Sequence, residues 1–207
     1  MARAQPAPDP FPTLERPARV EPEKILGSRF VATAAPVADA EAAAGLLAAV
    51  RAEFPGADHH GFAWRLAPPL AEVRSGDDGE PSGSTGLPIL RQIEGLGLFA
   101  VAVVVARWFG GTKLGVGGLM RAYGGAARQA LEAGGLAWRR REICARIALP
   151  YACQGVLTGW LGECSGRVLS ARYGADIELE LALPALEHER WLAELRERTG
   201  GRLRRLD

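Results

Sequence analysis

The sequence has few cysteines and no long apolar run, and each scarcity excludes a class of protein. The three cysteines, Cys144, Cys153 and Cys164, form no Cys-x-x-Cys pair and have no histidine at metal-ligand spacing. This pattern indicates free thiols in a reducing compartment rather than a disulfide framework or a zinc site. No apolar run approaches the length of a membrane span, so we expect no membrane partner. The amino terminus lacks the apolar stretch of a signal peptide, which predicts a cytoplasmic protein.

An excess of either charge is also lacking, because the formal net charge is only +1. A balance this close to zero gives no global field that would favour nucleic acid or a membrane surface. Lysine is rare as well, since Lys24 and Lys113 are the only two. Nearly every cation is therefore an arginine, which suits phosphate or carboxylate recognition better than lysine does.

What the sequence does contain is enough apolar material for a proper core, with a hydrophobic fraction of 48% over 207 residues. That length allows one large domain or two small ones. The prolines and alanines of residues 1–24 predict a flexible or loosely docked tail. A change of pattern near residue 141 places a domain boundary there, which gives a first domain at 25–141 and a second at 142–207.

The first domain alternates predicted strands and helices around one apolar strand. The run from Ala100 to Ala106 is apolar throughout and bounded by glycines, which is typical of a central strand buried on both faces. Asp39 is placed to cap a helix start. The other expected strands are 28–36, 60–66 and 72–74, and the expected helices are 41–53, 87–93 and 119–133.

The second domain has a different order of elements. We expect strands at 143–149, 167–172, 175–183 and 202–206, with helices at 151–164 and 186–198. This β-α-β-β-α-β order is the ferredoxin-like plan. The predicted fold class is therefore α/β in the broad sense (α+β), with two domains.

An acidic loop, residues 77–86 (DDGEPSGSTG), holds three carboxylates within four positions: Asp77, Asp78 and Glu80. These oxygens can hold a hard cation or supply a general base. The alternative is a loop tied down by its own side-chain hydrogen bonds, with a turn at Asp78-Gly79. The closing glutamate of an EF-hand is missing, which excludes that motif. The sequence leaves the cation or general-base site and the self-tied loop both open.

A glycine segment, residues 110–118 (GGTKLGVGG), follows the apolar strand and opens into a predicted helix. Unpaired amides at a helix start suit an anion, and Lys113 and Arg121 would add positive charge. The segment is not a Walker A loop, because no Gly-Lys-Ser/Thr occurs at the needed spacing. Tight packing that admits only glycine is the alternative. Arg107 either joins this site or pairs with Asp77 or Asp78 as a staple.

Two long motifs give the sequence a family resemblance. They are DDGEPSGSTG (77–86) and ARWFGGTKLGVGGLMRAYGGA (106–126), with weaker support from SRF (28–30) and HHGFAWR (59–65). On these motifs the chain resembles the YigZ/IMPACT family. The resemblance implies a first domain with a β/α sandwich like the ribosomal fold of elongation factor G domain IV. It also implies a ferredoxin-like second domain and, by analogy with eukaryotic relatives, a part in translation.

The resulting hypothesis is a non-enzymatic protein that binds RNA, the ribosome or a translation-related protein partner and regulates translation, without a cofactor. The alternative hypothesis is a metal-dependent hydrolase or phosphotransfer enzyme that uses Asp77, Asp78 and Glu80. No oligomeric state is indicated. The expected binding residues are Asp77, Asp78, Glu80, Ser82, Arg107, Gly110, Gly111, Lys113, Gly117, Gly118 and Arg121.

Overall fold

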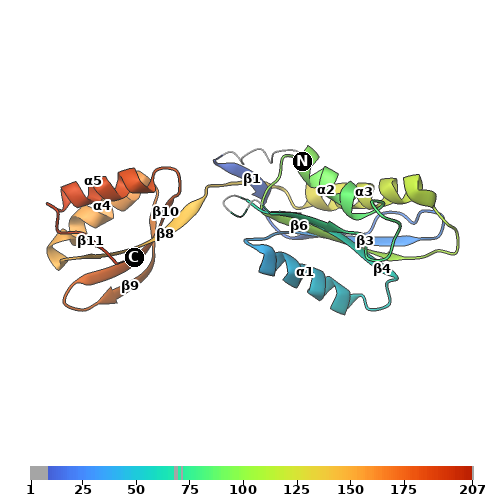
Figure 1. Cartoon of the computed structure of the whole chain (residues 1–207), viewed down its shortest axis with the longest axis horizontal. Helices are drawn as coiled ribbons and strands as arrows, with labels where there is room; N and C mark the ends of the chain where they lie inside the picture. The colour runs from blue at the N-terminus through green and yellow to red at the C-terminus, as the bar shows by residue number, and fades with distance from the viewer. Residues whose placement is uncertain (1–8, 68–69, 71, 207) are drawn as a thin grey trace. The chain divides into compact units, whose positions relative to one another are not determined.

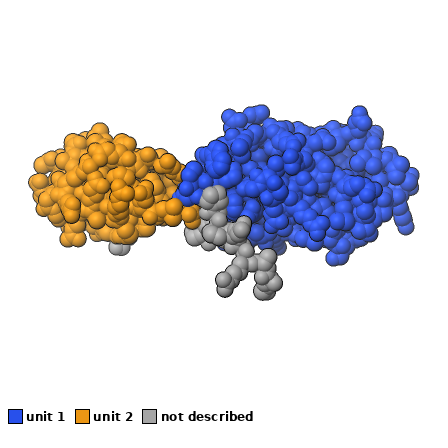
Figure 2. Space-filling model, turned by 90° about the horizontal axis from the view of Figure 1, so that it is seen from above, with its two compact units in different colours: residues 1–139 blue, residues 140–207 orange. Residues whose placement is uncertain are grey.

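A computed structural model describes residues 9–67, 70 and 72–206, and the chain divides into two compact units, residues 1–139 and 140–207 (Figure 2). Each unit combines helices with a sheet, which confirms the predicted mixed α/β class. Within the described residues, none of the helices has the length and apolar character needed to span a bilayer.

The first unit contains a five-stranded sheet in which every pair of neighbours is antiparallel. Its central strand is β6, Val101–Trp108, and every residue of β6 except Trp108 is buried. The prediction of a central strand covered on both faces is therefore confirmed. The strands lie in the order β2 (Ala18–Val20), β3 (Arg29–Pro36), β6, β4 (His59–Arg65) and β5 (Val73–Gly76).

Helices cover both faces of this sheet, with α2 (Gly86–Gly95) and α3 (Gly115–Ala133) on one face and α1 (Ala40–Glu53) on the other (Figure 1). The valines at 101, 103 and 105 pack in the α2–α3 layer, while Ala102 packs in the α1 layer, because side chains alternate along a strand. Asp39 caps α1 as predicted, since its carboxylate accepts from the Ala42 amide at 2.8 Å.

A two-stranded ribbon joins the start of the chain to the end of this unit. Strand β1, Phe11–Leu14, pairs antiparallel with β7, Leu136–Arg139. Phe11 and Leu14 are buried, and Leu14 belongs to the main core. Residues 11–14 and 18–20 therefore differ from the flexible tail expected over 1–24, because buried apolar area offsets the entropy lost on ordering them. Residues 1–8 of that expected tail lie outside the described residues.

The second unit follows the predicted β-α-β-β-α-β order, and its sheet runs β11-β8-β10-β9. Its core lies between the sheet and the two helices α4 and α5, around Trp160, Ile147 and Leu181. The expected strand 202–206 is shorter than predicted, since only residues 204–205 form it. The elements are β8 (Glu142–Leu149), η1 (Tyr151–Cys153), α4 (Gln154–Cys164), β9 (Arg167–Tyr173), β10 (Ile177–Pro184), α5 (His188–Arg198) and β11 (Arg204–Arg205).

Candidate functional site

Asp77 fastens the acidic loop to the start of α2. Its Oδ1 accepts from the amides of Thr85 and Gly86 and from the Thr85 hydroxyl, each at 2.9 Å, and its Oδ2 accepts from the Gly83 amide at 2.8 Å. Burial alone would raise the pKa of the Asp77 carboxyl, but the amide hydrogen bonds outweigh it and hold the pKa below its ordinary value. For Asp77 the structure supports the interpretation of a loop held by its own hydrogen bonds.

Asp78 connects the acidic loop to α1, on the face of the sheet opposite α2. Its carboxylate forms an ion pair with Arg51 of α1 and accepts from the His60 amide at 2.7 Å. Asp78 and Gly79 both have positive φ, +49° and +86°, which is the expected turn. The carbonyl oxygen of Asp78 also lies 2.8 Å from Nδ1 of His59. Asp78 is therefore committed to local structure, as Asp77 is.

Glu80 forms a buried ion pair with Arg107 at the end of β6. The Arg107 Nη1 donates to Glu80 Oε1 at 2.6 Å, and both side chains are only 5% exposed. The Tyr123 hydroxyl donates to the same oxygen at 2.9 Å, and Arg107 Nη2 donates to Ser28 Oγ at 3.2 Å. Burial, together with the Glu80 charge, raises the pKa of Tyr123 well above its ordinary value.

This pairing corrects one expectation about Arg107. The sequence suggested Asp77 or Asp78 as its partner, but both carboxylates are occupied elsewhere and Glu80 takes that place. The three acidic side chains therefore point to three separate sets of partners. Over the described residues there is also no group of three His, Cys, Asp or Glu side chains arranged to hold a metal ion. The geometry thus gives the metal-dependent alternative no specific support.

The glycine segment differs from its prediction in where the helix starts. Helix α3 begins at Gly115, not at residue 119, so Gly117 and Gly118 belong to its first turn. Positive φ at Gly115, +70°, lets the chain enter the helix this early. Leu114 occupies the N-cap position, no side chain caps the helix, and its first turn holds no acidic residue. The unpaired amides that the sequence predicted here therefore belong to the first turn of α3, residues 115–118.

Gly110 serves packing rather than recognition. A Cβ built on Gly110 would lie 1.9 Å from the carbonyl carbon of Gly27, so only glycine fits against that backbone. The Gly110 amide also lies 3.2 Å from Ser28 Oγ, which accepts its hydrogen bond. Gly111 is exposed with φ of +87°, and nothing lies within 4 Å of the Cβ that a larger residue would carry there. Its glycine is thus required by the turn.

Residues of the acidic loop and of the glycine segment line one cleft of about 320 Å³. The buried Glu80–Arg107 pair contributes to its lining, and Phe109 and Val116, 48% and 52% exposed, line it as well. The lining residues are Glu80, Pro81, Arg107, Phe109, Lys113, Leu114, Gly115, Val116 and Leu119. The cleft is therefore mainly apolar, with a buried ion pair, one lysine and an uncapped helix start.

Arg121 lies next to this cleft although it does not line it. A Cβ on Gly117 would lie 3.7 Å from the Arg121 Nη1, so the guanidinium reaches back over the first turn of α3. Glycine at 117 thus leaves the first-turn backbone open beside a cation. Together with Lys113, this gives the start of α3 two positive side chains, and its first turn contains no acidic residue.

The structure therefore brings together only some of the predicted binding residues. Glu80, Arg107 and Lys113 line the cleft, with Arg121 beside it. The members that do not line it are Asp77, Asp78, Ser82, Gly110, Gly111, Gly117 and Gly118. Sequence reasoning missed Phe109 and Val116. Phe109 was visible as an aromatic residue between a strand end and two glycines, where no core position remains for it.

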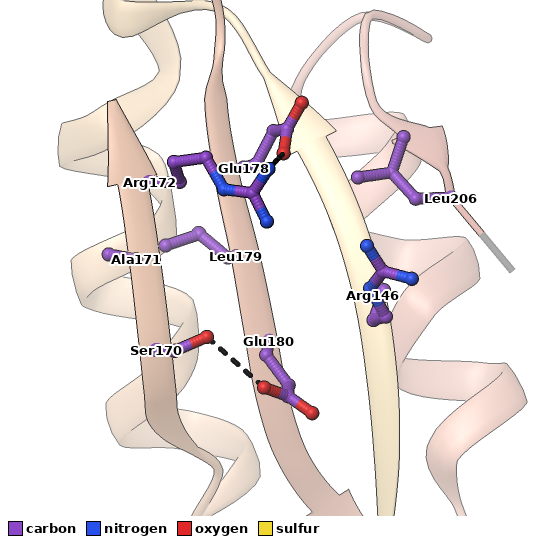
Figure 3. A pocket seen from close by; sticks show the side chains of 8 residues that line it. All are labelled: Arg146, Ser170, Ala171, Arg172, Glu178, Leu179, Glu180 and Leu206. Atoms are coloured by element: carbon purple, nitrogen blue, oxygen red, sulfur yellow. Dashed lines mark hydrogen bonds and ion pairs between the residues drawn. The ribbon is translucent and has the colours of Figure 1, made fainter. Parts of the chain in front are cut away.

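The second unit has a larger hollow, about 570 Å³, on the face of its sheet opposite α4 and α5 (Figure 3). Two contacts join side chains of its lining, since Arg172 pairs with Glu178 at 3.7 Å and the Ser170 hydroxyl donates to Glu180 at 3.1 Å. Arg172 is 80% exposed, so this pair is well solvated and contributes little. None of the side chains that line this hollow carries a buried polar atom without a partner.

The chain matches two known families. Residues 26–131 match the "Impact N-terminal domain", and residues 147–202 match a "Domain of unknown function (DUF1949)". The chain is 38% identical over 188 residues to "IMPACT family member YigZ" of Escherichia coli, covering 89% of this chain and 91% of the relative. It is 52% identical over 107 residues to "IMPACT family member in pol 5'region" of Thermus thermophilus, covering 52% and 56%.

A solved structure has the same fold. It is described as "Crystal structure of an hypothetical protein", with a TM-score of 0.70, 34% sequence identity, and coverage of 94% of this chain and 95% of that chain. The fold match extends over both units, and that description states no activity.

Proposed function

This chain belongs to the IMPACT family, and we propose that its first unit binds single-stranded RNA in the cleft between the acidic loop and α3. One observation carries the proposal. An exposed aromatic ring, two cations and an uncapped helix start lie around one concavity, and these are the groups that a nucleotide needs. The protein would act by binding, with no chemical step.

The start of α3 supports the phosphate part of the proposal. Acidic side chains normally favour a helix start, because the unpaired amides there carry partial positive charge. Helix α3 has no acid in its first turn and has Lys113 and Arg121 beside it instead. In the free protein the two cations repel the partial positive charge of the amides, and a bound anion would offset that repulsion. An RNA phosphate meets that need through amide hydrogen bonds and two cations.

Phe109 supports the base part of the proposal. Its ring is 48% exposed at the cleft, where burial in the core does not explain it. A base that stacks on an exposed aromatic ring contributes about 1–3 kcal/mol, whatever its identity. Only an unpaired base can enter a cleft of this kind, because bases in an RNA duplex are stacked and paired. We therefore propose single-stranded rather than double-stranded RNA.

A role in translation is the finer part of this proposal. It is supported by the resemblance of the 77–86 and 106–126 motifs to a family whose eukaryotic relatives regulate translation. Ribosomal and messenger RNA both present single-stranded segments of the kind that the cleft fits. A protein partner on the same surface is the competing occupant, and it would not show the salt dependence of phosphate binding.

Fluorescence anisotropy with a labelled single-stranded RNA tests the proposal. We expect the unaltered protein to bind and the affinity to fall as salt rises, because phosphate contacts release counterions. The double variant Lys113→Ala/Arg121→Ala should bind at least tenfold more weakly and with a shallower salt slope, by about two phosphate contacts. Its thermal unfolding should match that of the unaltered protein, since both side chains are exposed.

A matched control removes the same charge from the other end of α3. Arg16 donates to the Ala133 carbonyl at the last residue of that helix, and Arg128 lies in its second half. At a rise of about 1.5 Å per residue, both lie roughly 20 Å or more from Gly115. Arg16→Ala/Arg128→Ala should therefore keep the affinity and the salt slope. Equal losses in both variants, or no RNA binding at all, would refute the proposal.

A further inference from the structure

One donor among the lining residues of the cleft has no acceptor. The Arg107 side chain is only 5% exposed, and its Nη1 and Nη2 donate to Glu80 and Ser28. Its Nε is buried and has no hydrogen-bond partner among the described residues. Arg107 lines the same cleft as Gly115 and Val116, which belong to the first turn of α3. A buried cationic donor without an acceptor therefore lies beside an uncapped helix start.

An acceptor from a ligand would satisfy that donor. A buried donor without a partner keeps the full cost of losing its water, and an anionic acceptor recovers much of that cost. Because Nε is buried, only an oxygen that projects from the ligand can reach it. The ring of Phe109 lies over the same guanidinium, with its centroid 5.6 Å from Cζ, and it is 48% exposed. We therefore expect this ring to shift when a ligand enters.

The cleft also has more positive charge than one phosphodiester offsets. Among the described residues that line it, Glu80 is the only acid, and Arg107 balances it at 2.6 Å. Lys113 and Arg121 then leave two positive charges, and the start of α3 adds about half a charge. Asp58, which accepts from the Phe109 amide, is exposed to water and does not line the cleft. A phosphodiester carries one negative charge, whereas a phosphate monoester carries about −1.5 to −2 at pH 7.

We infer that the cleft takes the end of an RNA strand through its terminal phosphate monoester, an inference that rests on the proposed RNA binding. A terminal phosphate leads the strand, so one of its oxygens can reach Arg107 Nε, whereas an internal phosphate is flanked by a sugar on each side. The other two free oxygens accept from the first-turn amides of α3 and from its two cations. A volume of about 320 Å³, near the lower end for ligand pockets, suits one terminal nucleotide rather than a length of strand.

Three forms of one oligonucleotide test this on the unaltered protein. Each is an oligo-uridine of about nine nucleotides, within the usual site size for single strands, labelled internally so that both ends stay free. One form carries a 5′ phosphate, one a 3′ phosphate, and one a hydroxyl at each end. Anisotropy should show one phosphorylated form binding about tenfold more tightly than the hydroxyl form, because a charge-assisted hydrogen bond contributes that much. The form that binds more tightly identifies the end.

A fourth form separates a monoester from the mere presence of one more phosphate. Its terminal phosphate is methylated, which lowers the charge to one and leaves only two free oxygens. This form should lose most of the tenfold gain. A gain that methylation leaves intact would overturn the monoester as the recognised group.

The outcomes separate this inference from the proposed function. Equal affinity for the phosphorylated and hydroxyl forms would overturn the inference of a strand end and leave RNA binding intact. Binding of none of the forms would overturn both. Displacement of the phosphorylated strand by uridine monophosphate as readily as by a second strand would assign the site to a free mononucleotide and overturn the strand end.

A variant then ties the gain to Arg107. Arg107→Lys keeps a positive partner for Glu80 but has no Nε, so it should abolish most of the gain from the terminal phosphate while the hydroxyl form binds as before. A full gain in the folded variant would overturn the contact with Nε. Circular dichroism shows whether the variant folds. If it does not fold, the oligonucleotide series on the unaltered protein decides.

Discussion

The acidic loop and the glycine segment line the same cleft but treat their backbone amides in opposite ways. Asp77 accepts four hydrogen bonds around the start of α2, so a side chain of the acidic loop pairs the backbone amides there. The glycine segment leads into α3 with no cap and no acid in the first turn. Both helices pack on one face of the same sheet. The start of α2 is therefore capped and that of α3 uncapped because of their local sequences, and not because they lie in different layers of the fold.

The two helix starts differ in whether a side chain of the same unit pairs their backbone amides. Replacing a good N-cap usually costs about 1 kcal/mol, so a helix that lacks one forgoes stability. Helix α2 gains that stability through Asp77, whereas α3 does without it and has Arg121 over its first turn. Asp77 thus serves mainly as a brace, and the uncapped start of α3 is the part that we propose to bind a ligand.

The largest expected effect comes from breaking the link between the two segments, the Glu80–Arg107 pair. Arg107→Met leaves Glu80 buried without its cation, which should lower the free energy of unfolding by about 3–5 kcal/mol. Urea denaturation followed by circular dichroism measures it. The double change Glu80→Gln/Arg107→Met removes both charges and should recover much of the loss. A single variant as stable as the unaltered protein would show that the pair does not hold the segments together.

Removing the brace should have the next largest effect. Asp77→Ala deprives three amides and a hydroxyl of their acceptor, and we expect a loss of about 3 kcal/mol at neutral pH. The folded-state pKa of Asp77 is depressed, so its contribution is full above the unfolded-state value and is lost as pH falls through the folded-state value. The two proteins should therefore converge in stability in acid, below about pH 4. A difference that does not depend on pH would contradict this account.

A smaller loss is expected within the glycine segment at Gly110. Gly110→Ala drives a methyl group into the backbone of Gly27 and Ser28, with built Cβ distances of 1.9 and 2.1 Å. The segment must shift, which should cost roughly 2–3 kcal/mol in unfolding free energy. Differential scanning calorimetry would detect the lower Tm. An unchanged Tm would mean that the segment is loose and that Gly110 does not serve packing.

The smallest effect, of opposite sign, is expected a few residues further on. Gly117 is helical, its φ is not positive, and the nearest group to a built Cβ is the Arg121 guanidinium at 3.7 Å. Gly117→Ala should therefore stabilise the protein by about 0.5 kcal/mol through helix propensity. The same calorimetry measures it beside Gly110→Ala. A loss of stability as large as that of Gly110→Ala would show that Gly117, like Gly110, is required for packing.

The sequence predicted the scaffold well because local pattern determines it. The apolar run at 100–106 became β6, and the glycines at 134–135 end α3 as expected. The failures involve partners distant in the chain. Nothing in residues 11–14 reveals that β7, more than a hundred positions later, would pair with them. Long-range strand pairing depends on tertiary contacts that no window of sequence contains.

The candidate site was predicted only in part, for the same reason. The two motifs and Arg107 were identified, yet the register that places Arg107 against Glu80 rather than Asp77 or Asp78 depends on how β6 and the acidic loop pack. The start of α3 was placed four residues late, because glycines count against a helix by propensity. Here the turn at Gly115 and the packing of α3 overrode that preference.

RNA bound at the uncapped start of α3 would change the environment of the backbone amides there, which can be observed one by one. Amide ¹H–¹⁵N spectra of the full chain, titrated with a single-stranded oligonucleotide, would report each position separately. We expect the largest shifts at residues 109–118 and Arg121, with the amides of Gly83, Thr85 and Gly86 nearly unmoved because Asp77 accepts their hydrogen bonds. Shifts confined to the Asp77-bound amides or to the second unit, or no shifts at all, would contradict it.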